Sequence, residues 1–256
     1  MTGHLASIGQ VWLRNAWVYR DRWFYGLLPN FFEPVFYLLG LGVGLGFYVS
    51  TGGAFGGDYV GFIIPGLIAV SAMNGASFET TYNVFVKLHF GKIYDATIAT
   101  PVGIEDVTLG EAAWAVTRAL IYGGVFLLVT LAFGTAFDGR LVLAMLAIAV
   151  VGYAFSGLGL AFTSLVPTID LFSYYFTLFL TPSFLFSDVF FPVAERFPPA
   201  LARVAEFTPL YRSVQLMRGV MGGDLGTLWI DLGYLLSFGT GLLAFAVWRM
   251  RKRMVR

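Results

Sequence analysis

The feature that most constrains this chain is a series of six apolar stretches, each long enough to approach or exceed the ~20 residues that a helix needs to cross a bilayer. They lie at residues 27–49, 59–86, 111–137, 140–166, 171–191 and 226–248. The turns between them are short, as at Gly134 to Arg140 and at Pro167 to Asp170. The pattern predicts an all-α integral membrane protein with six transmembrane helices.

The composition supports a membrane protein. Of the 256 residues, 58% are hydrophobic and only 12% are charged, whereas a soluble domain carries about 25% charged residues. A net charge of +1 without a basic stripe argues against a nucleic-acid partner. The chain has no cysteine, which excludes disulfides, thiolate metal sites and a cysteine nucleophile.

Two further segments flank or interrupt the predicted spans. Apolar residues recur at spacings of three and four over residues 5–24, which predicts an amphipathic helix in the membrane interface. Between spans five and six, proline pairs flank a short piece with Leu201, Val204 and Ala205 on one side. We expect a re-entrant helical hairpin there, packed against protein, because irregular backbone is not tolerated in hydrocarbon.

The short loops leave no room for a soluble module, so we expect one membrane domain over residues 1–256. Its parts are the interfacial helix at 1–26, spans one to five at 27–191, the outer hairpin at 192–225, and span six with a basic tail at 226–256. With the N-terminus inside, ten Lys and Arg lie on the inner side and five on the outer side. That excess predicts that both termini lie in the cytoplasm. We expect the multi-pass protein in a bacterial or archaeal plasma membrane.

Motifs of soluble enzymes are not found. Neither Lys87 nor Lys92 follows the glycine-rich loop that cradles phosphates, so we expect no ATP hydrolysis and no cofactor in this chain. His4 and His89 lie far apart and begin no metal-binding pair. Two alternatives stay open, an intramembrane acyl or glycosyl transferase and a passive channel or structural membrane subunit. The first would need a converging acid, base or metal cluster near one membrane surface.

Glycines in span one match the small-x-x-x-small pattern of close helix contacts, Gly40 with Gly44 and Gly42 with Gly46. The pattern fits a contact with a second copy or packing within one chain.

Ionisable residues inside predicted spans are a sharper signal, because each is costly unless paired or hydrated. Glu33, Glu79 and Arg118 all fall roughly 9 to 12 Å inside the inner boundary at 1.5 Å per residue. We expect Arg118 to pair with Glu79 or with Glu33. The group is either a static ion pair or part of a moving gate or substrate contact.

Aromatic residues crowd the fifth stretch. Phe172, Tyr175, Phe176 and Phe179 are candidates for a pathway lining that stacks on sugars or guides acyl chains. The alternative is bulk that faces lipid or forms an interfacial belt, and periodicity does not separate the two.

In its order of elements the chain resembles the permease subunit of type-2 ABC exporters. The resemblance covers nearly the whole chain and rests on several short pieces with conserved order and spacing. These are PNFFEPVFYLLGLGVGLG in span one, YVGFIIPGL in span two, KIYDATIATPV and Gly110-Glu111 in the inner loop, and SDVFFPVAERFP with TPLYRSVQLMRG on the outer side. Within that family the chain is most similar to the branch of lipo-chitooligosaccharide (nodulation factor) and drug exporters.

The resemblance implies a homodimer in the membrane that works with two copies of an ATP-binding cassette subunit, which would bind ATP and magnesium. Residues 90–101 would then form a coupling helix seated on that ATPase, with Tyr94, Asp95, Thr97, Thr100 and Pro101 as the expected contacts. Spans one, two and five of two copies would enclose the pathway. The implied activity is export of a lipid-linked glycan, a lipo-oligosaccharide or an amphipathic drug.

Overall fold

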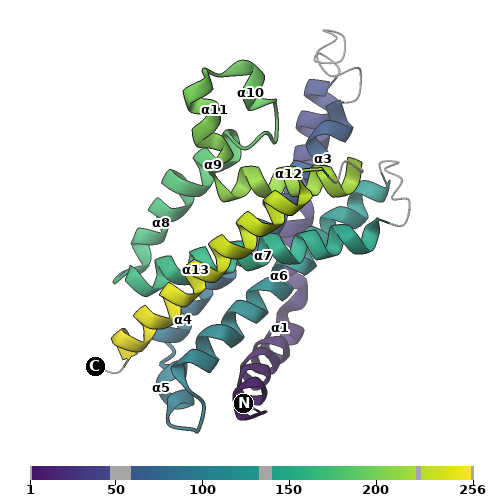
Figure 1. The fold of residues 1–256 in the computed structure, drawn as a ribbon. Helices are drawn as coiled ribbons and strands as arrows, with labels where there is room; N and C mark the ends of the chain where they lie inside the picture. Colours follow the sequence, from purple (N-terminus) through teal and green to yellow (C-terminus); the bar gives the residue numbers. More distant parts are fainter. Residues whose placement is uncertain (1, 47–58, 133–139, 223–225, 255–256) are drawn as a thin grey trace.

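The computed structural model describes residues 2–46, 59–132, 140–222 and 226–254, and every regular element within these ranges is helical (Figure 1). The helices are long and lie side by side, with their apolar side chains forming one main core. The core contains five fully buried residues, Ile63, Ile68, Phe126, Phe155 and Leu210. The predicted all-helical class is therefore confirmed.

The first element is longer than its sequence pattern indicates. Helix α1 spans Thr2–Tyr37 and continues directly into the π-helical segment η1, Leu38–Leu45. The sequence predicts an interfacial helix over 5–24 that is distinct from span one at 27–49, but the backbone passes between them without a break. A change from amphipathic to apolar side chains does not interrupt the backbone hydrogen bonds, so it does not end a helix.

Span two forms one long rod. Helix α3 (Tyr59–Phe78), the π-helical turn η2 (Glu79–Asn83) and helix α4 (Val84–His89) follow one another without a gap. The short helix α5, Ile93–Ile98, comes next and ends before Pro101, as predicted from the restricted backbone ahead of a proline. Helix α6, Ile104–Ala132, then returns along the bundle.

Helices α7 (Leu141–Leu165) and α13 (Leu228–Met254) pack closely against each other. Glycine makes this possible, because a Cβ on Gly157 would lie 2.6 Å from the carbonyl oxygen of Gly239. In span one, Gly42 lies against Val60 and Ile63 of α3, and Gly46 lies against Tyr59. That pair therefore serves packing within the chain.

The fifth apolar stretch and the segment after it are broken into short helices. In chain order these are η3 (Ile169–Leu171), α8 (Phe172–Tyr174), the π-helical η4 (Tyr175–Leu180), α9 (Thr181–Leu185), α10 (Val193–Arg196), α11 (Pro199–Glu206) and α12 (Pro209–Gly222). On α11 the buried residues are Ala202 and Ala205, whereas Leu201 and Val204 are 45% and 66% exposed. Of the predicted side with Leu201, Val204 and Ala205, only Ala205 is therefore buried within the chain.

Four helices are long and apolar enough to cross a membrane: Tyr59–His89, Ile104–Leu131, Leu141–Leu165 and Leu228–Arg253. They correspond to predicted spans two, three, four and six. Among the residues searched, a shorter apolar helical stretch, Val35–Gly44, lies within the first rod. In the fifth stretch the helical run ends at Leu185, and Asp188 follows with a positive φ of 60°.

Different segments of the chain lie at the two ends of the molecule. In Figure 1 both chain ends and α5 lie at the lower end of the view, and α10 and α11 lie at the upper end. Side-chain contacts agree with this arrangement, since His4 binds Asp106 at 2.8 Å and Arg251 binds Glu105 at 3.2 Å. The inner loop and both termini therefore share one end, as the charge count predicts.

Candidate functional site

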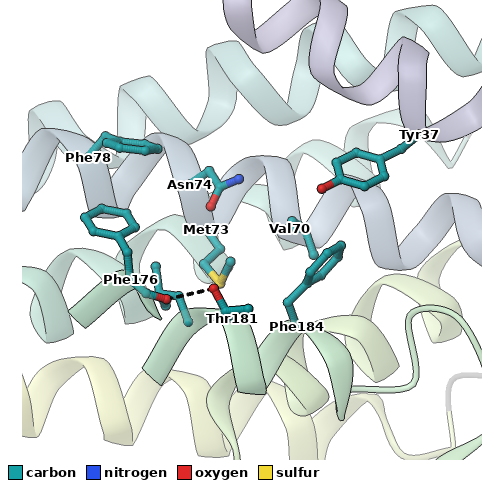
Figure 2. Close-up of a pocket in the computed structure, with 9 residues that line it drawn as sticks. Tyr37, Val70, Met73, Asn74, Phe78, Phe176, Thr181 and Phe184 are labelled. Carbon is teal, nitrogen blue, oxygen red and sulfur yellow. Dashed lines mark hydrogen bonds between the residues drawn. The ribbon is translucent and has the colours of Figure 1, made fainter. Parts of the chain in front are cut away.

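An aromatic cleft of about 240 Å³ opens between the first helix, α3 and the η4–α9 segment. Figure 2 shows two aromatic pairs on either side of it, with Asn74 between them. Phe78 and Phe176 stack with ring centroids 4.6 Å apart, and Tyr37 meets Phe184 edge-on at 5.8 Å. The remaining lining residues are Val70, Met73, Leu180 and Thr181.

This cleft is mostly apolar and has a few polar groups at defined positions. None of the described residues that line it is charged; the amide of Asn74 and the hydroxyl groups of Tyr37 and Thr181 supply the polar side-chain atoms of this lining. The Thr181 hydroxyl already donates to the carbonyl oxygen of Phe176 at 3.0 Å. The cleft can thus hold uncharged ring faces or aliphatic chains, with Asn74 able to donate and accept hydrogen bonds.

One described π-helical segment, η4, lines this cleft, and two others, η1 and η2, begin directly after lining residues. Tyr37 directly precedes η1, Phe78 directly precedes η2, and Phe176 lies within η4. A π-helical turn inserts one extra residue and frequently marks a functional site.

The four aromatic residues predicted for the pathway lie in different surroundings in the structure. Phe172 and Tyr175 lie in the packed interior at 0% and 3% exposure, so neither lines an open cleft in this structure. Phe179 is half-buried and stacks on Tyr175, with centroids 6.1 Å apart. Only Phe176 of the four reaches the aromatic cleft. Phe78 and Phe184 were not predicted, since both belong to apolar runs that give no directional signal.

A cluster of charged residues lies nearer the end that holds the termini. Arg118 of α6 pairs with Glu79 of η2, with Nε 3.4 Å from Oε2. This agrees with one of the two predicted pairings. The side chain of Glu33 lies outside the described residues, so the alternative pairing is not described.

The cluster extends well beyond the predicted residues. The Lys87 ammonium lies 3.4 Å from Glu79 and 2.8 Å from Glu111, and Arg14 lies 3.0 Å from Glu111. Asn15 donates to Glu111 at 2.9 Å and accepts from Lys87 at 3.2 Å. The cluster thus joins α1, the η2–α4 rod and α6. Sequence reasoning missed Lys87 and Glu111 because both fall at predicted span ends, where charge is ordinary.

Helix α5 is attached to this cluster through Tyr94. The Tyr94 side chain is 2% exposed and packs among Val84, Val107 and Leu160, with Glu111 alongside. Burial, and then the negative charge of Glu111, raise the pKa of Tyr94 well above its ordinary value. Tyr94 therefore anchors α5 to the bundle and does not present its ring outward, contrary to its predicted role as a partner contact.

The other predicted α5 residues face differently. Thr100 and Pro101 are exposed, while Thr97 is half-buried and its hydroxyl donates to the Ile93 carbonyl at 2.7 Å. The side chain of Asp95 lies outside the described residues. Phe90, just before α5, is 69% exposed. The sequence did not predict this exposure, because Phe90 follows an apolar span in which its side chain looks like part of the span.

On the opposite end, Asp188 organises the outer segment. Its carboxylate accepts from the Val193 amide at 2.6 Å, from Gln215 at 2.9 Å and from Arg218 at 3.2 Å. Arg218 also stacks over the Phe62 ring at 4.1 Å. These contacts fasten the start of α10 to α12 and α3.

Among the described residues, no three His, Asp or Glu side chains gather in a geometry that could hold a metal ion. Several charged residues at each end are instead paired with one another.

Comparison with known proteins identifies the family. Residues 6–221 match the ABC-2 type transporter family. Nodulation protein J of Rhizobium leguminosarum bv. viciae is 34% identical over 247 residues, covering 96% of this chain and 94% of the relative. That of Rhizobium meliloti is 33% identical, covering 96% and 93%.

A more distant relative is the probable multidrug ABC transporter permease YbhR of Escherichia coli, 26% identical over 76% of this chain and 54% of the relative. No solved structure matches the chain significantly. With most of its length matched by the family and by relatives above 30% identity, the chain belongs to the ABC-2 type transporter family of membrane permeases.

Proposed function

We propose that this chain is the membrane subunit of an ATP-driven exporter, with ATP hydrolysed by a separate subunit on the side that holds both termini. The observation that carries the proposal is the arrangement of α5. Helix α5 lies at that end of the bundle, the exposed residues Thr100 and Pro101 follow it, and its Tyr94 side chain is inserted beside Glu111. Such a helix is suited to receive motion from a partner and pass it inward.

The route for that motion is the charged cluster. Glu111 next to Tyr94 binds Lys87, Lys87 binds Glu79, and Glu79 binds Arg118. The Glu111–Lys87 and Glu79–Arg118 contacts both join the η2–α4 rod to α6, and the Lys87–Glu79 contact lies within the rod. Displacement of α5 is therefore expected to shift the rod relative to α6. Rigid-body motion of packed helices between two arrangements is the usual basis of such switching.

We further infer a transport pathway that includes the aromatic cleft, within a homodimer of six-span subunits capped by the α10–α11 hairpin. Supporting this, the cleft is bordered by the first, second and fifth apolar segments, the last through the π-helical η4. A Cβ on Gly40 would meet nothing within 4 Å, so this face of η1 is open to a second copy. The lining suits an amphipathic substrate such as a lipid-linked glycan, a lipo-oligosaccharide or a drug.

The decisive experiment is mild-detergent purification of the full chain from its native membrane, followed by identification of co-purified proteins and an ATPase assay. Ala96→Arg on α5 and Ala6→Arg on α1 form a matched pair, since both alanines are exposed and lie on helices at the same end of the molecule. We expect a stoichiometric ATP-binding partner that is lost with Ala96→Arg and kept with Ala6→Arg.

Tyr94→Ala tests transmission separately from binding. It should leave the partner bound but reduce ATPase-driven transport, because α5 would lose its anchor. A chain that stays without a partner after crosslinking in the membrane, and whose transport is unaffected by Ala96→Arg, would instead favour a passive channel. Turnover of an acyl or glycosyl donor by the purified chain would favour a transferase.

A further inference from the structure

A second cleft, of about 630 Å³, lies behind the charged cluster, between α1, the η2–α4 rod, α5 and α6. Its outer part is apolar and open, with Val18, Val86 and Ile93 at 64%, 43% and 38% exposure. Its inner part is polar and contains Lys87, Glu79 and Arg118. The cleft is therefore apolar in one part and polar in the other, which matches an amphiphile with an apolar tail and a polar headgroup. It does not involve η4 or α9, so it is separate from the aromatic cleft.

The floor of this cleft holds donors that the protein itself does not satisfy. The Arg118 side chain is only 9% exposed, and its Nη1 has no hydrogen-bond partner among the described residues. The Tyr19 hydroxyl, which lines the same cleft, is also buried and without a described partner. A buried unsatisfied donor costs about 1–3 kcal/mol, and more when charged, so this position is suited to an external acceptor.

The charges around the floor also favour an anion. The cations Arg14, Lys87 and Arg118 face only two carboxylates, Glu79 and Glu111, among the described residues. Among the described residues, these five side chains thus carry one net positive charge. A single negative group in the cleft would balance it and accept from the unsatisfied donors.

We propose that this cleft binds the anionic headgroup of a membrane amphiphile, with a phosphate or similar group at Arg118 and Lys87. The apolar part of the ligand rests on Val18, Val86 and Ile93. Because Ile93 is the first residue of α5, the occupied cleft supports the position of that helix. The inference does not depend on the transport function. A phospholipid and free phosphate share this headgroup chemistry, and the test separates them.

The full chain, purified in detergent, is examined by native mass spectrometry with phosphatidylglycerol, phosphatidylcholine or inorganic phosphate. Val86→Trp and Val18→Trp fill the cleft from opposite walls, and both valines are exposed enough for the fold to tolerate the change. The matched control is Val142→Trp at the start of α7, where valine is 68% exposed and lines none of the described clefts.

We expect the wild-type chain to retain phosphatidylglycerol over phosphatidylcholine. Retention should fall at least about ten-fold in Val86→Trp and Val18→Trp, and in Arg118→Gln where that variant folds, with Val142→Trp unchanged. Displacement by excess inorganic phosphate would support the anion site with free phosphate as its source; persistence would identify the lipid. Equal retention of the two lipids, or binding unaffected by both tryptophan variants, would overturn the proposal.

Discussion

The Arg118 guanidinium of α6 and the Glu79 carboxylate of η2 lie 3.4 Å apart, and each side chain is more than nine-tenths buried. The rings of Tyr19 and Tyr122 flank the guanidinium at 4.2 and 4.5 Å. Two buried charges in contact depend on each other, because removal of one leaves the other uncompensated in a medium of low dielectric. This pair therefore holds the η2–α4 rod against α6 in the arrangement that the structure describes.

Arg118→Met is expected to lower the free energy of unfolding by about 3–5 kcal/mol, and the double variant with Glu79→Gln by less than the sum of the two single changes. Unfolding in detergent of the single and double variants measures this coupling. The exposed Arg20–Asp21 pair, 3.8 Å apart, is the control, and its coupling should be near zero. Strictly additive effects at Arg118 and Glu79 would show that the pair is not a unit.

The close approach of α7 and α13 gives a second prediction. Gly157→Ala should destabilise the protein strongly, since its Cβ would lie 2.6 Å from the Gly239 carbonyl oxygen. That oxygen belongs to the backbone of α13, so it cannot move aside as a flexible side chain could. A loss on the order of 2–3 kcal/mol is expected for overpacking. At Gly241 of α13 a Cβ meets nothing within 4 Å, so Gly241→Ala should be neutral or slightly stabilising. Similar thermal stability of the two variants would contradict the packing.

The Arg253 side chain supplies hydrogen-bond donors to the carbonyl groups at the C-terminal end of α7. Its guanidinium donates to the carbonyl oxygens of Thr163, Ser164 and Val166 at 3.0, 3.2 and 2.9 Å. Cations at a helix C-terminus stabilise by about 0.3–1 kcal/mol, and buried hydrogen bonds add to this. Arg253→Ala should therefore lower the unfolding midpoint measurably. Arg251→Ala, which breaks an exposed pair with Glu105, should not. Hydrogen exchange at the end of α7 localises the effect.

Apolar length predicts the long helices well, because twenty apolar residues in succession have few alternatives to a buried or membrane-spanning helix. Helix continuity was harder to predict. The change in side-chain pattern near Gly26 looks like a boundary, yet α1 passes through it. The π-helical turns were also not predicted, because the sequence Glu79 to Asn83 contains no residue that requires one.

The candidate site was predictable only in part. Glu79 and Arg118 stand out in apolar surroundings, but their connection to Arg14 depends on Glu111, which is 97 residues away from Arg14 in the chain. The orientation of Tyr94 depends on which face of α5 meets the bundle, and a helix of six residues has too few positions to show that pattern. Long-range pairing and the facing of short helices are properties of the assembled fold.

Access to the aromatic cleft can be tested without knowing the substrate, because the chain has no cysteine. Asn74 lines the cleft, while Ser77, three residues further along the same helix, is 0% exposed and contacts the Tyr175 hydroxyl at 3.2 Å. In membranes, a thiol at position 74 (Asn74→Cys) should react with a polar maleimide at least about ten-fold faster than one at position 77 (Ser77→Cys), since the thiolate needs access to water. Protection of position 74 by a candidate amphiphile would then identify a ligand of the cleft. If both positions react equally slowly in the assembled protein, the cleft is covered by a second copy or filled by lipid, and the pathway must lie elsewhere.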